Sequence, residues 1–343
     1  MPPKAIRRPL TVTTWLLVSA LVVSASPLLL TVGIVASRLT GRPQPEIVAR
    51  LTLTYFAYEL ATLVGCGALW LGAGAGLLVG TPRFQRLHWR LLRWFIAGLA
   101  AAGRDALDID VRADPTPDAT RALDSDQPLI VFSRHAGPGD TIFIIDELMT
   151  RYGRLPSVVF KETIALDPCV DLLGHRLPHA MLDTSDRDEC QARIKQVTEE
   201  LAPRGALLLF PEGGNFTPAR RRSALKRLRQ KGRRRSAERA EAMPNVLPPQ
   251  PTGSLAALDA RDHAEVLFAA HTGLGLAAYP LQWFRDMPIG RTLQTRMWAV
   301  PSDQVPSDPD EQADWLYGWW KRIDDWITAQ GTEGEIARDA VED

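Results

Sequence analysis

Two short motifs place side chains that can transfer protons directly after runs of apolar residues. The first run, 128–132, leads into Ser133-Arg134-His135-Ala136-Gly137-Pro138-Gly139-Asp140. Its Gly-Pro-Gly turn folds the chain back, so that the Asp140 carboxylate can reach the His135 imidazole. A carboxylate that fixes the tautomer of a histidine and stabilises its imidazolium makes that histidine a general base. The structural alternative is that Asp140 is the N-cap of the following helix.

The second motif ends the apolar run 206–210 with Pro211-Glu212-Gly213-Gly214. Here an expected strand ends in a turn that contains a carboxylate and two glycines. In open α/β sheets, ligands bind outside the carboxyl ends of the strands. We therefore expect His135, Asp140 and Glu212 to face one crevice.

The elements that must position these motifs alternate along the chain after residue 107. Short apolar runs bounded by turn residues alternate with helical patterns, which indicates an α/β domain with a largely parallel central sheet. Strands are expected at 107–111, 128–132, 157–160, 206–210, 266–270 and 293–300, and helices at 141–152, 188–201 and 310–328. The almost wholly polar segment 219–243 has helical propensity, and the prolines of 245–253 predict an extended segment.

The first 82 residues are predicted to form a membrane anchor, a hairpin of two transmembrane helices. Residues 12–37 and 60–82 contain no charged residue, and about 20 apolar residues suffice to cross a hydrocarbon core of about 30 Å. Pro27 is expected to kink the first helix, and the glycines of the second allow close helix packing. Two alternatives are buried helices of a soluble domain and a signal peptide cleaved after Ala25.

The charges that flank these runs predict the orientation of the anchor. Basic residues precede the first run and follow the second, although the connecting loop also carries arginines. The positive-inside tendency favours both ends, and hence the catalytic domain, at the cytoplasmic face. Residues 83–106 mix arginines with Trp89 and Trp94, which predicts an interfacial amphipathic helix or a helix packed on the domain. The catalytic domain is expected over 107–330, with a basic helix and Pro-rich insertion at 219–253, and 331–343 form an acidic tail.

The composition argues against several classes of site. The 343 residues have a formal net charge of +0, so there is no general bias toward nucleic acid. Three cysteines without a Cys-x-x-Cys spacing suggest neither a disulfide framework nor a zinc site. His175 and His179 are separated by a proline that spoils a helical metal-binding pair. His263 and His271 flank the expected strand at 266–270 and are expected to be structural.

The segment Arg220–Arg239 is strongly basic. Near a bilayer, such a segment is attracted to anionic lipid by about 1 kcal/mol per cation. We expect it to bind anionic lipid headgroups, and it is also suited to the phosphates of coenzyme A. A simply solvated insertion is the main alternative, and nucleic-acid binding is the weaker one.

Taken together, the two motifs resemble those of the glycerolipid acyltransferases of the lysophosphatidic acid acyltransferase (PlsC-like) family. The first block of that family is Asn-His-x-Ser-x-x-Asp, which His135 and Asp140 match, and its third is Phe-Pro-Glu-Gly-Thr-Arg, which 210–213 match. A second block corresponds to Lys161-Glu162, and 247–253 resemble the Leu-Pro-Arg-Thr-Lys-Gly stretch of the eukaryotic-type branch. The resemblance spans about 90–328.

This resemblance implies direct transfer of a fatty acyl group, without a bound cofactor, from acyl-CoA or acyl carrier protein to a lysolipid hydroxyl. His135 would be the base, Asp140 would steady its imidazolium, and Glu212 would orient the acceptor. The backbone N–H groups of Gly213 and Gly214 would stabilise the oxyanion. The alternatives are a membrane hydrolase or transacylase that uses the same pair, and a catalytically silent lipid-binding homologue.

Several positions depart from the family pattern. Arg134 replaces the Asn, Gly137 the Ser, and Gly214-Asn215 the Thr-Arg. Where the family has Phe-Ile-Asp-Arg, this chain has Met181-Leu182-Asp183-Thr184, with Arg187 displaced by three positions. The family arginines are thought to hold the acceptor phosphate. Here Arg134, Lys161, Arg187 or the basic helix are the candidates for that role, and the acceptor remains open.

Overall fold

The structure is a computed structural model that describes residues 2–137, 139–261, 264–275 and 280–331. Pro138 of the first motif, His263 and nearly all of the acidic tail lie outside the described residues. The chain begins with four helices, which are α1 (Lys4–Ser24), α2 (Ser26–Thr40), α3 (Gln44–Gly72) and α4 (Pro82–Leu107).

The first predicted span is divided into two helices. The break falls at Ala25, two residues before Pro27, because Pro27 lacks the N–H that a continuous helix would need there. The second span begins earlier than expected, at Gln44, and ends at Gly72. Residues 73–81 form turns in which Gly74 and Gly76 have positive φ, so the glycine-rich part of the predicted helix is not helical.

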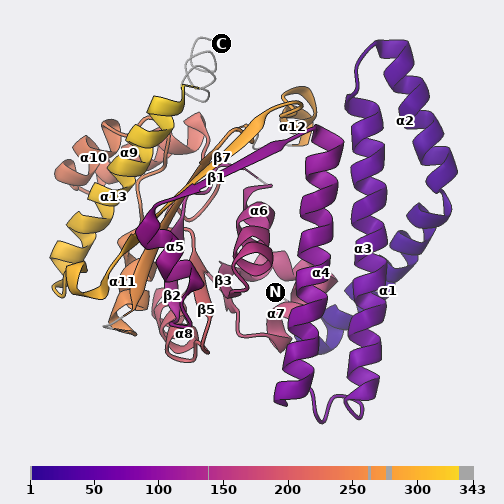
Figure 1. The fold of residues 1–343 in the computed structure, drawn as a ribbon, viewed down its shortest axis with the longest axis horizontal. Coiled ribbons are helices and arrows are strands. Elements are labelled where there is room, and N and C mark those ends of the chain that lie inside the picture. The colour runs from indigo at the N-terminus through magenta and orange to yellow at the C-terminus, as the bar shows by residue number, and fades with distance from the viewer. Residues whose placement is uncertain (1, 138, 262–263, 276–279, 332–343) are drawn as a thin grey trace.

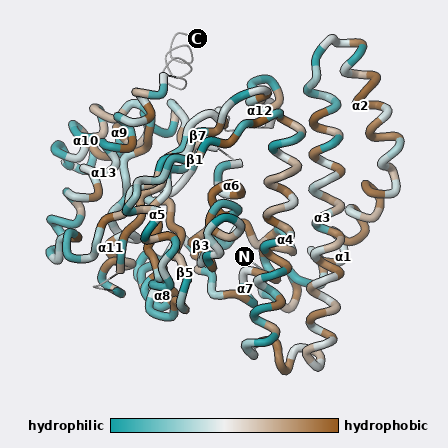
Figure 2. The backbone as a smooth tube through the Cα atoms, viewed as in Figure 1, coloured by the Kyte–Doolittle hydropathy of each residue, from teal (hydrophilic) through white to brown (hydrophobic). Residues whose placement is uncertain are grey.

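By length and composition, α1 and α3 could each cross a membrane. Only 11% of the apolar window in α1 and 22% of that in α3 are buried, which disfavours the alternative that they are core helices of a soluble domain. Figure 2 shows hydrophobic residues recurring along α2 and α3. Together, α1 and α3 support the predicted two-helix hairpin, with α2 as a shorter apolar helix between them.

The described residues after α4 form one seven-stranded sheet, in the order β1-β7-β6-β2-β5-β3-β4. Its strands are β1 (Asp110–Pro115), β2 (Leu129–Ser133), β3 (Leu155–Lys161), β4 (Ala180–Leu182), β5 (Gly205–Leu209), β6 (Glu265–Thr272) and β7 (Thr292–Val300). All neighbouring strands are parallel except β6 and β7. The predicted α/β fold with a largely parallel sheet is therefore confirmed.

Helices cover both faces of the sheet (Figure 1). One face packs on α4, α5 (Pro117–Asp124), α6 (Asp140–Asp146) and the π-helix η1 (Glu147–Arg151). The other packs on α8 (Arg187–Glu199), α9 (Pro218–Gln230), α10 (Arg234–Glu241), α11 (Pro251–Asp259) and α13 (Pro309–Gln330). The short elements η2 (Glu162–Leu166), α7 (Pro168–Arg176), α12 (Pro280–Arg285) and η3 (Ser302–Gln304) complete the fold.

Three segments differ from the sequence predictions. The interfacial candidate α4 packs between α3 and α6, so the packed alternative is confirmed, while contact with the membrane interface stays a prediction. The basic segment forms two helices rather than one, because the chain turns at Gly232 with a φ of +71°. The last residues of the Pro-rich segment begin α11, since proline is well tolerated in the first turn of a helix.

Candidate active site

His135 and Asp140 lie together at the carboxyl end of β2. The Nδ1 atom of His135 is 3.0 Å from Oδ2 and 3.1 Å from Oδ1 of Asp140. Because a carboxylate accepts there, Nδ1 carries the proton and Nε2 carries the lone pair. The His135 ring is partly exposed and lies against Phe210, with the ring centroids 4.6 Å apart. The imidazole is thus fixed in the tautomer that a general base requires.

Asp140 is the first residue of α6 and not its N-cap, so the capping alternative is wrong. Its Oδ2 accepts the backbone N–H groups of Ala136 at 2.7 Å and Gly137 at 3.1 Å, and its Oδ1 accepts the Thr141 hydroxyl. Burial alone would raise the pKa of Asp140, but hydrogen bonds and charge from His135 and His271 hold it well below its usual range. Asp140 is therefore ionised at neutral pH.

Glu212 is buried at the end of β5 and joins two loops. Its Oε1 accepts the backbone N–H of His135 at 3.1 Å, and its Oε2 accepts that of Leu247 at 2.9 Å. Burial raises the pKa of Glu212 to about 7, against the opposing effects of the Arg134 guanidinium and the two backbone N–H groups. The carboxylate positions the His135 backbone, which differs from the expected role of orienting the acceptor.

The glycine turn offers one free backbone donor. Gly213 has a φ of +70°, and its N–H donates to the Phe210 carbonyl at 3.0 Å within the turn. This positive φ strains any residue with a side chain, and a Cβ atom at Gly213 would also displace the Gln250 amide, whose Nε2 would lie 2.5 Å away. In the described part of the chain, the Gly214 N–H makes no hydrogen bond. Of the two predicted oxyanion donors, Gly214 is the one that remains available.

Comparison with known proteins finds one family model that includes the residues of this site. Residues 114–248 match the Acyltransferase family model. Residues 114–248 are therefore the part of the chain that is similar to acyltransferases. The match includes His135, Asp140 and Glu212, and the resemblance drawn from the motifs is confirmed at this level.

Among solved structures, the crystal structure of the 1-acyl-sn-glycerophosphate (LPA) acyltransferase PlsC from Thermotoga maritima is similar to this chain. The similarity has a TM-score of 0.47 and 14% sequence identity, and covers 82% of this chain and 98% of that one. No curated protein matches the sequence of the chain.

Arg134 of the acyltransferase domain does not take the role expected of it. The side chain is fully buried, and its guanidinium donates to the carbonyl oxygens of His271 at 2.6 Å and Asn245 at 3.0 Å. A guanidinium held inside by backbone carbonyls does not reach an acceptor phosphate. Arg134 instead faces the buried Glu212 carboxylate and lowers its pKa.

The other predicted phosphate-binding cations lie at different distances from the His135–Asp140 pair. Lys161 is exposed at the end of β3, and Arg187 is exposed at the start of α8, beyond the edge strand β4. Three strand spacings separate β2 from β4, about 14 Å. Arg220 at the start of α9 is nearer to the motif, because its Nη1 donates to the Asn215 carbonyl and lies 3.3 Å from a Cβ built on Gly214.

Sequence reasoning missed one histidine of this site. His271, expected to be structural, is buried on β6, and its Nε2 is 3.4 Å from Oδ2 of Asp140. The local sequence gives one indication, since His271, like His135, follows an apolar strand. That β6 lies beside β2 follows only from the fold.

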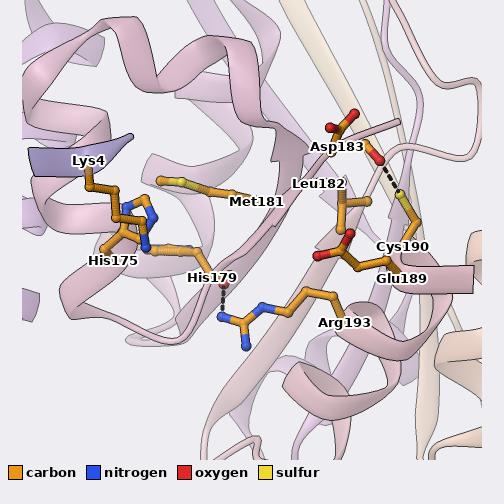
Figure 3. A pocket seen from close by; sticks show the side chains of 10 residues that line it. Lys4, His175, His179, Met181, Leu182, Asp183, Glu189, Cys190 and Arg193 are labelled. Carbon is orange, nitrogen blue, oxygen red and sulfur yellow. Dashed lines mark hydrogen bonds between the residues drawn. The ribbon is translucent and has the colours of Figure 1, made fainter. Parts of the chain in front are cut away.

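A cavity of about 330 Å³ lies beside β4, outside the His135 site (Figure 3). Lys4 and His175 line one side, Asp183, Glu189 and Cys190 the other, and Arg193 donates to the His179 carbonyl. Nδ1 of the buried His179 accepts the Val158 N–H, and His175 pairs with Asp171 at 3.0 Å. These contacts give both histidines structural partners in place of a metal ion.

In the described residues, Glu59, Asp167 and Cys169 bring possible metal-ligating atoms within 4.8 Å of one another. They lie where α3 meets α7, not beside His135. Asp167 is the N-cap of α7 and accepts the Tyr55 hydroxyl at 2.7 Å, so it already has structural partners. The site around His135 is built from an imidazole, carboxylates and backbone amides.

Proposed function

We propose that this protein transfers a fatty acyl group from a thioester, acyl-CoA or acyl carrier protein, to the hydroxyl of a lysophosphatidic acid-like or other lysolipid acceptor. The observation that carries this proposal is the His135 imidazole, which donates through Nδ1 to an ionised, buried Asp140 and keeps Nε2 as a base. The family match supports acyl transfer as the reaction class.

The proposed reaction is a direct displacement. Nε2 of His135 takes the proton of the acceptor hydroxyl while the oxygen attacks the thioester carbonyl. The negative charge that develops on the carbonyl oxygen is stabilised by the Gly214 N–H. The C–S bond then breaks, the ester C–O bond remains, and the imidazolium returns its proton to the leaving thiolate. Asp140 stabilises the imidazolium throughout, so the chain itself needs no covalent acyl intermediate.

Arg220 is the best-placed candidate for the acceptor phosphate. It is exposed and lies beside Gly214. The arginine of the family pattern would stand at the next position of the chain, 215. Among the described residues its guanidinium donates to the Asn215 carbonyl alone, at 3.1 Å, which leaves other N–H groups for a phosphate. This placement supports a phosphate-bearing lysolipid over a neutral lipid alcohol.

The proposed function can be tested by acyl transfer with purified protein in lipid nanodiscs. Labelled acyl-CoA is offered with a panel of lysolipids, and both the ester and the released free fatty acid are measured. His135→Ala and Asp140→Asn are expected to lower kcat by at least about a hundredfold, in the range of general-base catalysis. His175→Gln, a histidine outside the site, is the matched control.

The alternatives give different products. Fatty acid released equally with and without acceptor indicates a hydrolase. The absence of thioester turnover across the panel indicates a lipid-binding homologue without activity. Wild-type rates in His135→Ala would overturn the assignment of the base.

A further inference from the structure

Asp140 is contacted by a second imidazole. In the register of the sheet, Ala269 on β6 pairs with Ser133 on β2, which brings His271 beside the turn that follows β2. Nε2 of His271 lies 3.4 Å from Oδ2 of Asp140 and 3.3 Å from the Arg134 carbonyl oxygen. His271 is only 6% exposed. The His135–Asp140 pair of the proposed reaction is thus in contact with a second, buried histidine.

The surroundings of the ring fix its tautomer. Both atoms that face Nε2 are acceptors, so Nε2 carries a proton and donates to them. Nδ1 is buried and has no hydrogen-bond partner in the described part of the chain. His271 therefore donates through Nε2.

The ring has no room for a substrate. The neighbouring cavity of about 10 Å³ is lined by His271, Asp140 and mainly apolar residues, and its volume suits at most one water molecule. Thr295 lies opposite on β7 and donates to Oε2 of Glu147 at 3.4 Å, and the Arg134 guanidinium binds the His271 carbonyl. Of the His135 and Asp140 side chains, it is Asp140 that the His271 ring contacts. His271 is therefore expected to affect the reaction through the Asp140 carboxylate.

We propose that His271 is a positioning residue of the acyl transfer. Its Nε2–H holds the Asp140 carboxylate between two imidazoles, so that the carboxylate stays aligned with Nδ1 of His135 while the imidazolium forms. This proposal rests on the proposed function, in which His135 is the base.

Two variants distinguish the effect of the Nε2–H donor of His271 from the effect of the packing of its ring. His271→Gln keeps an N–H donor near the place of Nε2 and does not titrate, whereas His271→Leu fills the space without a donor. We expect His271→Leu to lower kcat by about tenfold to a hundredfold, the range for losing one hydrogen bond to a charged group. KM for acyl-CoA is expected to stay within about twofold. His271→Gln is expected to retain most of the wild-type kcat.

The pH dependence of kcat/KM gives a further test, because a change in packing alone would not shift it. Without the His271 donor, more of the Asp140 charge acts on His135, which stabilises its imidazolium. The neutral base then forms at higher pH, so the acid limb of kcat/KM moves upward in His271→Leu but not in His271→Gln. Thr295→Val changes the opposite wall of the cavity without touching Asp140, and is the control.

A measurement independent of turnover separates this proposal from the proposed function. Labelling of His135 by diethyl pyrocarbonate, which attacks neutral imidazole, is followed by mass spectrometry across pH. The midpoint is expected to rise in His271→Leu and to stay in place in His271→Gln, even if no acceptor is found. Equal midpoints in both variants and the wild type, or a loss in His271→Gln as large as in His271→Leu, would overturn the role of the Nε2–H donor.

Discussion

Two buried carboxyl groups of the site have pKa values that move in opposite directions. Asp140 receives hydrogen bonds from His135, His271 and two backbone amides, and these outweigh the effect of its burial. Glu212 has two backbone donors and the facing Arg134, yet its burial still raises the pKa to about 7. Such a separation assigns different roles to two acids. In the proposed function Asp140 serves the base, whereas Glu212 holds the backbone of His135 and Leu247 in place.

The raised pKa of Glu212 predicts a pH-dependent stability. The folded protein holds the Glu212 proton more tightly than the unfolded chain, whose ordinary pKa is 4.5. The contribution of this group to stability is therefore complete below pH 4.5 and is lost as the pH rises through about 7. Glu212→Gln imitates the protonated form at all pH values. Between these limits, the wild-type Tm is expected to fall relative to the variant, because one pKa unit is worth about 1.4 kcal/mol and a loss of about 1 kcal/mol lowers Tm by about 2–4 °C.

Thermal unfolding of both proteins, measured in the same detergent across this pH range, tests the prediction. Glu238→Gln on the exposed surface of α10 removes one carboxylate without burial, and its Tm difference from the wild type should not change with pH. A constant difference between wild type and Glu212→Gln would show that Glu212 does not titrate in this range.

The sequence predicted those site residues whose placement is local. His135 and Asp140 are joined by one turn, and Glu212 follows an apolar strand, so their types and spacing were sufficient. Arg134 was one candidate for the acceptor phosphate, and its burial could not be predicted because it depends on carbonyl groups of residues 245 and 271, more than a hundred positions away. His271 was missed for the same reason, since its contact with Asp140 requires β6 to pair with β2.

At the scale of elements, the buried strands were predicted well and the helix ends were not. Continuous apolar runs such as 206–210 identify strands that helices cover on both faces. Helix ends depend on single residues that hydropathy ignores. Ala25 before Pro27, Gly232 with a positive φ, and Pro251 at the start of α11 each shifted a boundary.

The helices α9 and α10 carry the predicted lipid-binding cations on their surface. Some of these have structural partners, as Arg221 does on the Met243 carbonyl and Arg235 on Asp314. Others are exposed and form no ion pair within the described ranges, namely Arg222, Lys226, Arg227, Lys231, Arg233 and Arg234. Figure 1 shows α9 and α10 across the sheet from α1, α2 and α3. We propose that these six cations bind anionic lipid apart from the anchor.

Replacing these six cations with Gln is expected to weaken binding to vesicles that contain anionic lipid, while binding to purely zwitterionic vesicles stays the same. Each cation contributes about 1 kcal/mol near an anionic surface, and salt screens that attraction. Flotation of the full-length protein across a salt series measures it. Arg221→Gln and Arg235→Gln, which lose structural contacts but little free charge, are the controls. Wild-type binding that depends neither on the salt concentration nor on the content of anionic lipid would contradict the proposal.

At the scale of the whole molecule, α7 connects the predicted anchor to the domain that contains the sheet. Arg7 at the start of α1 is buried and lies 2.6 Å from Asp171 of α7, which Arg8 also contacts at 2.9 Å. Gln85 at the start of α4 donates to the Arg176 carbonyl at the end of α7. The chain therefore meets the domain both where the anchor begins and where it ends. Since one partner of a buried ion pair is costly to remove, these contacts favour an anchor retained on the domain over a cleaved leader.

The cytoplasmic position of the domain stays a prediction, and the cysteines of the chain provide a test. Cys66 and Cys169 are buried, whereas Cys190 at the start of α8 is partly exposed. Burial and the neighbouring carboxylates raise the pKa of the Cys190 thiol, so labelling needs mildly alkaline buffer. A membrane-impermeant maleimide is expected to label the protein in inverted vesicles of a bacterial host but not in right-side-out vesicles. Cys190→Ser should abolish the label, and label in right-side-out vesicles would place the domain outside.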